Sequence, residues 1–163
     1  MTSNNKIELM APAGNFESLQ AGLDNGADSV YFGVEQLNMR ARATVNFTMD
    51  DLPEIAKRCE AKKVRSYLTL NTIIYDHDLS VVKTLLTKAK EANITAVIAS
   101  DQAVIAMARG IGMEVHISTQ LNVTNIETIK FYSLFADTMV LSRELSLRQV
   151  KSITTQIEKE QIK

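Results

Sequence analysis

Short apolar runs alternate with segments of helical periodicity along the whole chain. The runs are rich in aliphatic and β-branched residues and are bounded by turn residues, which is typical of buried strands. Between them, apolar residues recur every three or four positions, as on one face of an amphipathic helix. Strands that alternate with helices predict right-handed βαβ units and a parallel sheet. The expected strands cover residues 7–11, 29–32, 64–71, 96–99, 114–119 and 138–142.

The number of these units indicates the architecture. A (β/α)8 barrel has eight units in about 250 residues, whereas this chain has six units in 163 residues. The expected fold is α/β, a TIM-barrel-like parallel sheet made of six βα units of an incomplete (β/α)8 barrel. Because no linker interrupts the pattern, we expect one domain over residues 1–163. We expect this domain to be truncated before a seventh strand. The first and last strands would have free edges, which predicts self-association or covering by neighbouring segments.

Turn and capping residues mark the expected helix boundaries. Asn25 and Gly26 are typical of the end of the first helix. Pro53 places the start of the second helix near Asp51, because proline is tolerated only in a first helical turn. Two capping boxes are expected, one formed by Thr124 with Glu127 and one by Ser146 with Gln149.

Composition and charge narrow the class of protein. The chain is 45% apolar and 23% charged, with a net charge of −1 and a pI of about 6.1, so no strongly basic field favours nucleic acid. Cys59 is the only cysteine, which excludes an intrachain disulfide. The first six residues are polar, unlike a signal peptide, and no apolar run approaches the ~20 residues of a membrane span. We expect a cytoplasmic protein without membrane contact.

Polar residues gather at the carboxyl ends of the expected strands, where barrels of this kind carry their functional sites. On the fifth strand His116, Ser118 and Gln120 alternate with Val115 and Ile117. Helices would cover the aliphatic side, so the polar row is expected to face the barrel interior. Buried polar groups cost about 1–3 kcal/mol each unless they are paired, which indicates either a ligand or a satisfied network. His116 is equally compatible with a hydrogen-bonded core histidine. Thr69 and Asn71 on the third strand follow the same alternation.

Three arginines fall on the same predicted face and suggest an anion site. Arg40 and Arg42 lie in the long segment after the second strand, and Arg143 ends the sixth. Guanidinium groups suit carboxylate or phosphate, although each arginine alone is typical of a residue that braces a loop. We assign no catalytic residue and no metal site. The candidate binding residues are Arg40, Arg42, Asn71, His116, Ser118, Gln120, Asn122, Arg143 and Glu144.

Other common constellations are absent from the sequence. One cysteine and two distant histidines do not make a metal quartet, and neither a Walker A loop nor a Gly-x-Gly-x-x-Gly motif occurs. A triad of Ser118, His116 and Glu144 is disfavoured, because nothing makes Ser118 a strained, exposed nucleophile. Asp101 follows the fourth strand and is expected to cap a helix.

Several segments of the sequence together form a recognisable pattern. They are ELMAPAGN at 8–15, AD at 27–28 with VYFG at 30–33, NMRARA at 38–43 with NF at 46–47, YLTLNT at 67–72, HISTQLN at 116–122 and LSREL at 141–145. These segments resemble peptidase family U32, the collagenase-like proteases, and the similarity covers nearly the whole chain in the same order.

This resemblance implies the N-terminal barrel part of a bacterial cytoplasmic protein. Some members of the family have collagenase-like activity, others hydroxylate a tRNA uridine with prephenate or a ribosomal cytidine, and others serve ubiquinone hydroxylation. Several carry an iron–sulfur cluster on cysteines that follow the sixth helix. The resemblance thus implies no cofactor in residues 1–163, with any cluster beyond Lys163, and a fragment that is inactive alone.

Two functions remain open from the sequence. The first is a peptidase, a hydrolase with a peptide substrate. The alternative is the scaffold domain of a prephenate-linked tRNA or rRNA hydroxylation enzyme that binds a small carboxylate. RNA contact is expected only in a full-length protein.

Overall fold

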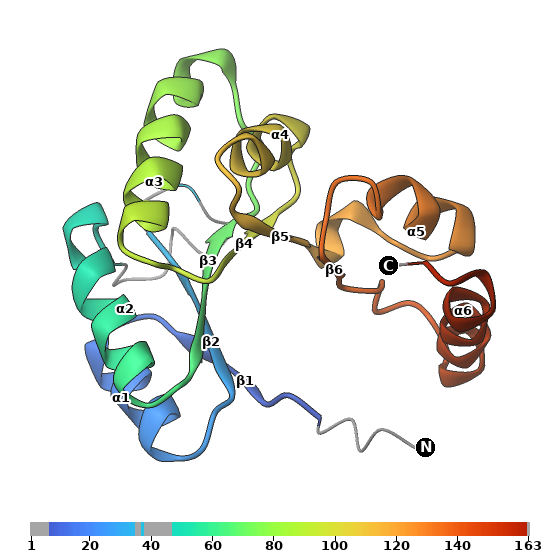
Figure 1. Ribbon diagram of the computed structural model, residues 1–163, viewed down its shortest axis with the longest axis horizontal. Coiled ribbons are helices and arrows are strands. Elements are labelled where there is room, and N and C mark those ends of the chain that lie inside the picture. The colour runs from blue at the N-terminus through green and yellow to red at the C-terminus, as the bar shows by residue number, and fades with distance from the viewer. Residues whose placement is uncertain (1–6, 35–36, 38–46, 163) are drawn as a thin grey trace.

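The computed structural model describes residues 7–34, 37 and 47–162. In this part of the chain six parallel strands form one sheet in sequential order (Figure 1). The strands are β1 (Met10–Ala13), β2 (Ser29–Gly33), β3 (Arg65–Leu70), β4 (Ala96–Ala99), β5 (Glu114–Ile117) and β6 (Thr138–Met139). The helices are α1 (Phe16–Asp24), α2 (Leu52–Ala61), α3 (Leu79–Glu91), α4 (Gln102–Gly110), α5 (Ile126–Tyr132) and α6 (Leu147–Glu160). Three 3₁₀ turns are η1 (Met49–Asp51), η2 (Asp76–Asp78) and η3 (Thr119–Leu121).

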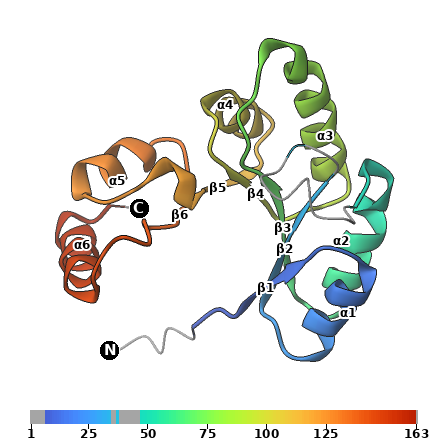
Figure 2. The ribbon, with the colours of Figure 1, turned by 180° about the vertical axis from the view of Figure 1, so that it is seen from behind.

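The helices lie against one face of the sheet. Figures 1 and 2 show α1 to α4 side by side along strands β1 to β5, while α5 and α6 lie together beside β6. The sheet is not closed, since among the described residues no strand joins β1 to β6. The expected fold, an open TIM-barrel-like sheet of six βα units, is confirmed.

The main hydrophobic core fills the space between the sheet and its helices. Leu68, Val97 and Val115 are fully buried on the strands, and Leu19 and Leu86 are fully buried or nearly so on the helices. Each such side chain contributes about 1.5–3 kcal/mol by its removal from water. A second, smaller cluster lies on the opposite face of the sheet and consists of Tyr67, Ala96 and Ile98, with Tyr31 packed against it.

The first strand differs from the sequence expectation. It begins at Met10 rather than near Ile7, and it continues through Pro12 and Ala13, beyond the expected end at residue 11. Pro12 pairs in register with Tyr31 of β2. Proline is tolerated here because β1 is an edge strand within the described sheet. The N–H that Pro12 lacks is not needed on the side of β1 that faces away from β2.

One of the two expected capping boxes is wrong. Helix α5 is capped by Asn125, whose side chain accepts a hydrogen bond of 3.0 Å from the N–H of Thr128, and not by Thr124. Asparagine ranks above threonine as an N-cap, which explains the shift by one residue. The capping box of Ser146 with Gln149 at the start of α6 is confirmed.

The last two strands are shorter than expected. β5 ends at Ile117 because Ser118 caps the 3₁₀ turn η3, and β6 has only two residues. A single parallel bridge from Val123 to Leu141 continues the pairing beyond β6. Within the described ranges, no helix combines the length and the apolar character that crossing a membrane requires.

Candidate functional site

The two faces of β5 have different neighbours. Val115 and Ile117 belong to the core that packs against the helices. His116 lies on the opposite face, where it pairs in register with Ile98 and contacts the ring of Tyr67 edge-on, with ring centroids 4.6 Å apart. This face would line the interior of a closed barrel. Strand β5 therefore presents His116 to the inner face, as its alternation with the two aliphatic residues indicated.

His116 is paired with a carboxylate on the same strand. Its Nε2 lies 2.7 Å from Oε1 of Glu114, two residues earlier on the same face. The histidine side chain is 7% exposed, whereas that of Glu114 is 35% exposed. The imidazole is thus held at Nε2 by a neighbouring carboxylate.

A polar network continues from this pair across the inner face. The hydroxyl of Tyr67 donates a hydrogen bond of 2.8 Å to Glu8, just before β1. Glu8 also pairs with the guanidinium of Arg65, which lies over the ring of Tyr67. Burial is the main cause that raises the pKa of Tyr67, so its hydroxyl stays protonated and acts as a donor. The network ties the first, third and fifth strands together.

Thr69 has an unsatisfied hydroxyl in the same row as His116. The register places Thr69 opposite Ile98, and Ile98 opposite His116. Within the described chain the Oγ1 atom of Thr69 is buried and has no hydrogen-bond partner. The row lies one residue before the carboxyl ends of β3 and β5. Such an orphan hydroxyl calls for an explanation, because buried polar groups are normally paired.

Ser118, Gln120 and Asn122 lie beyond the end of β5. Ser118 is buried and its hydroxyl donates to Oε1 of Gln120 at 3.2 Å, while it also caps η3. Gln120 is exposed within that turn, and the exposed Asn122 follows with a left-handed φ of 49°. The extended conformation continues through Ser118 and ends at Thr119, where η3 begins, so strand alternation does not apply to Gln120 and its inward direction stays a prediction.

The residues after β6 form a local cluster. The hydroxyl of Ser142 donates to the carboxylate of Glu144, and this bond is the main cause that lowers the pKa of Glu144. Arg143 between them is exposed. The N–H of Ser142 donates to the carbonyl of Val123 at 2.9 Å, which brings this segment beside the one that follows β5.

No Ser–His–Glu triad assembles among these residues. Ser118 bonds to Gln120, His116 to Glu114, and Glu144 to Ser142. The remaining candidates do not join this cluster either. Asn71 follows β3, is partly exposed and has a partner of its own. Arg40 and Arg42 lie outside the described residues, so the convergence of three arginines stays a prediction.

An iron–sulfur cluster does not fit the residues of this chain. Such clusters are held mainly by several cysteine thiolates, and the sequence has one cysteine. Cys59 is buried in α2, and burial raises the pKa of its thiol to about 11, which disfavours the thiolate that a metal needs. The described part of the chain also contains no group of three potential metal-binding side chains.

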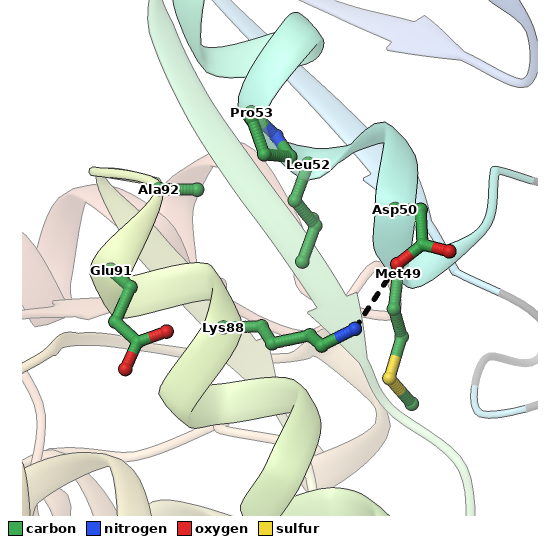
Figure 3. A pocket seen from close by; sticks show the side chains of 7 residues that line it. All are labelled: Met49, Asp50, Leu52, Pro53, Lys88, Glu91 and Ala92. Atoms are coloured by element: carbon green, nitrogen blue, oxygen red, sulfur yellow. Dashed lines mark hydrogen bonds and ion pairs between the residues drawn. The ribbon is translucent and has the colours of Figure 1, made fainter.

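A groove of about 360 Å³ lies on the outer helical layer, between η1 with the start of α2 and the end of α3 (Figure 3). Along one side of the groove, Lys88 Nζ lies 3.1 Å from a carboxylate oxygen of Asp50. Apolar atoms of Met49, Leu52 and Pro53 line it as well. The residues of the groove come from helices and not from strand ends, so we place the candidate functional site on the inner face of the sheet.

The sequence interpretation missed part of this inner network. Glu114 lies two positions before His116, so the two side chains project from the same face of the strand. This spacing in the sequence could have identified Glu114 as a partner of His116. The partners of Tyr67 were not predictable in the same way, because Glu8 and Tyr67 are 59 residues apart and meet only through the strand register.

Comparisons with known proteins agree with this fold. The sequence model of peptidase family U32 matches residues 14–162. The chain belongs to peptidase family U32. It is 52% identical to a collagenase of Porphyromonas gingivalis over 97% of this chain and 38% of that protein. It is 36% identical to the tRNA hydroxylation protein P of Helicobacter pylori over 91% of this chain and 36% of that protein. The chain thus spans less than two fifths of these relatives.

Solved structures show the same fold at low sequence identity. The structure of the U32 peptidase Mk0906 superposes with a TM-score of 0.75 at 13% identity, covering 95% of this chain and 67% of that one. A deoxyribose phosphate aldolase from Aeropyrum pernix superposes with a TM-score of 0.66 at 17% identity, covering 90% and 69%. The U32 chain therefore has the barrel-type architecture of these proteins.

Proposed function

We propose that this chain is the N-terminal barrel part of a U32 hydrolase that cleaves peptide bonds in collagen-like substrates. The observation that carries the proposal is the 52% identity to a collagenase over 97% of the chain. A second relative, an uncharacterized protease of Methanocaldococcus jannaschii, is 43% identical over 96% of the chain. The inner-face network at β5 supports the proposal, because it provides an oriented histidine near the strand ends.

A second function has its own support among the relatives. The 36% identical relative is named a tRNA hydroxylation protein, and a 30% identical one from Escherichia coli is a 23S rRNA 5-hydroxycytidine synthase. In this alternative the barrel part is a scaffold that binds a small carboxylate through Arg40, Arg42 or Arg143. RNA contact then belongs to the whole protein and not to this part.

The partners and cofactors follow from the same proposals. Residues 1–163 carry no cluster of their own, and any cluster of the intact gene product is held by cysteines elsewhere. The free edges of β1 and β6 pair with further segments or with a second copy of the chain. Hydrolysis requires those further segments, so residues 1–163 alone are inactive.

The test compares two activities of the intact gene product. Incubation with gelatin, followed by quantification of new amino termini, measures hydrolysis. Titration with prephenate, citrate and sulfate measures anion binding, and is repeated with Arg143→Ala and with the control Arg148→Ala on exposed α6. Peptide cleavage supports the hydrolase. Absent cleavage together with anion binding that only Arg143→Ala weakens supports the alternative and overturns the first proposal.

A further inference from the structure

The inner face of the sheet carries an unpaired hydroxyl and an oriented imidazole in one row. Oγ1 of Thr69 is buried without a hydrogen-bond partner among the described residues, and Nε2 of His116 is held by Glu114. They belong to the row Thr69, Ile98, His116, on adjacent strands β3, β4 and β5. Neighbouring strands are about 4.8 Å apart, so the two backbones are separated by about 10 Å with only the apolar Ile98 between them.

We propose that this row is the hydrolytic centre, in which His116 is the catalytic general base and Thr69 binds the reacting group. The inference rests on the proposed peptidase function. The unpaired hydroxyl of Thr69 and the imidazole of His116, which Glu114 holds, are explained together if a water molecule or a substrate carbonyl lies between them. If Thr69 served packing alone, valine would fill the same space at a lower cost in free energy. A buried hydroxyl without a hydrogen-bond partner is unfavourable, whereas a methyl group in its place is not.

The geometry assigns a distinct task to each group. A water proton passes to Nδ1 of His116 while the water oxygen bonds to the carbonyl carbon of the peptide. The carbon–nitrogen bond then breaks, and the imidazolium returns the proton to the leaving amine, so the reaction consumes one water and needs no other reactant. Glu114 is a positioning residue, since its carboxylate, 2.7 Å from Nε2, fixes the ring and stabilises the imidazolium.

Charged groups around the imidazole support a base rather than a bound anion. Glu114 on the same strand is the nearest ionisable partner, and Tyr67 contacts the ring with its edge. Beyond Tyr67, the charges of Glu8 and Arg65 are paired with one another. On the other neighbouring strands the row presents the uncharged Ile98 and Thr138. The carboxylate of Glu114 beside the imidazole disfavours an anion bound at this position.

The test measures kcat/KM of the intact gene product on gelatin and on a quenched Gly-Pro-repeat peptide. His116→Asn is expected to lower the rate by about 10²- to 10⁴-fold, the usual contribution of a general base. His77→Asn is the matched control, because His77 is the only other histidine and its side chain is 80% exposed. Glu114→Gln keeps the size of the side chain and an acceptor for Nε2, and is expected to lower kcat with little change in KM, a split that a loss of folded protein would not produce.

Thr69→Val provides an independent test of the proposal if His116→Asn fails to fold. Valine matches threonine in shape and removes a hydroxyl that has no partner in the described chain, so the melting temperature should stay constant or rise. The rate should nevertheless fall about tenfold, as expected for one lost hydrogen bond to the reacting group. An unchanged rate for folded Thr69→Val or His116→Asn overturns this inference alone. A wild-type protein that leaves both substrates intact overturns the peptidase function and the inference together.

Discussion

Cys59 illustrates how burial alone sets the chemistry of a residue. It sits on the core side of α2, 1% exposed, and was predicted from the sequence as a cysteine without a disulfide partner. Burial raises the pKa of its thiol from 9.0 to about 11. The thiolate is the reactive form, so this higher pKa lowers the thiolate population at pH 8 by roughly a hundredfold.

We therefore predict that Cys59 is inert in the native protein. Reaction with a chromogenic disulfide reagent at pH 8 should be at least about a hundredfold slower in buffer than in 6 M guanidinium, where the thiol is exposed. Equal rates in the two conditions would show that the native thiol is accessible and that the burial described for α2 is wrong.

Residue patterns predicted some of the candidate site and missed the rest for physical reasons. The inward direction of His116 followed from strand alternation, which holds as long as the chain stays extended. It does not extend to Gln120, because the extended chain ends after Ser118, which caps η3. The contact of Tyr67 with Glu8 depends on the pairing of three strands, which no local pattern encodes.

Helix ends show the same contrast at the scale of elements. Ser146 with Gln149 formed the expected capping box, whereas Asn125 displaced Thr124 at α5 because its amide side chain caps better. Local chemistry therefore predicts that a helix begins in a region, and competition between adjacent capping residues decides the position. The end of α1 at Asn25 and Gly26 was predicted correctly.

Gly26 provides a prediction at this scale. Its φ of +84° lies in the left-handed region, and no atom lies within 4 Å of an added Cβ. Gly26→Ala should therefore lower the free energy of unfolding by about 1 kcal/mol through backbone strain and not through a clash. Gly110→Ala is the matched control, since its added Cβ also meets nothing within 4 Å and its φ is not positive. Equal urea midpoints for the two variants would contradict this account.

Lys130 connects two helices and gives a prediction on pH. Its ammonium lies 2.7 Å from Glu160 of α6 and 2.9 Å from Glu127 of α5. Its hydrogen bond to Glu160, followed by that to Glu127, raises the pKa of Lys130 above 10.5. A raised lysine pKa means that the stabilisation is complete below pH 10.5 and is lost as the pH rises through the folded value.

Glu160→Gln should consequently destabilise the protein at pH 7, and this loss should shrink when both proteins are measured near pH 11.5. Urea denaturation of the variant and the wild type at the two pH values measures the difference. Glu158→Gln, on the same helix, should have little effect at either pH. A difference for Glu160→Gln that is the same at both pH values would show that the ion pair does not hold α6 in place.

The described part of the molecule is an open sheet with β1 and β6 at its two edges. The six-unit architecture was predictable because each strand and helix carries its own periodicity, and right-handed connections leave one sequential order. The open edges expose backbone groups, and three large apolar side chains near the end of α5 are also exposed. They are Phe131 at 57%, Leu134 at 70% and Phe135 at 41%.

Residues 1–163 on their own should therefore self-associate. Sedimentation velocity at rising concentration should show a shift toward dimers or larger species, driven by strand pairing at the β1 and β6 edges. Phe131→Ser with Leu134→Ser tests whether the apolar surface of α5 contributes, and Thr155→Ser on α6 serves as the control. A single monomer peak at the highest concentration would contradict the prediction.

Cleavage of gelatin by the intact gene product tests the central claim most directly. The measurement is the number of new amino termini formed over time, with heat-denatured protein as the blank. The account predicts steady formation of new termini by the wild type and by His77→Asn, with a rate at least a hundredfold lower for His116→Asn. Gelatin that gains no new termini with folded wild-type protein would contradict the account of this U32 chain as part of a peptidase.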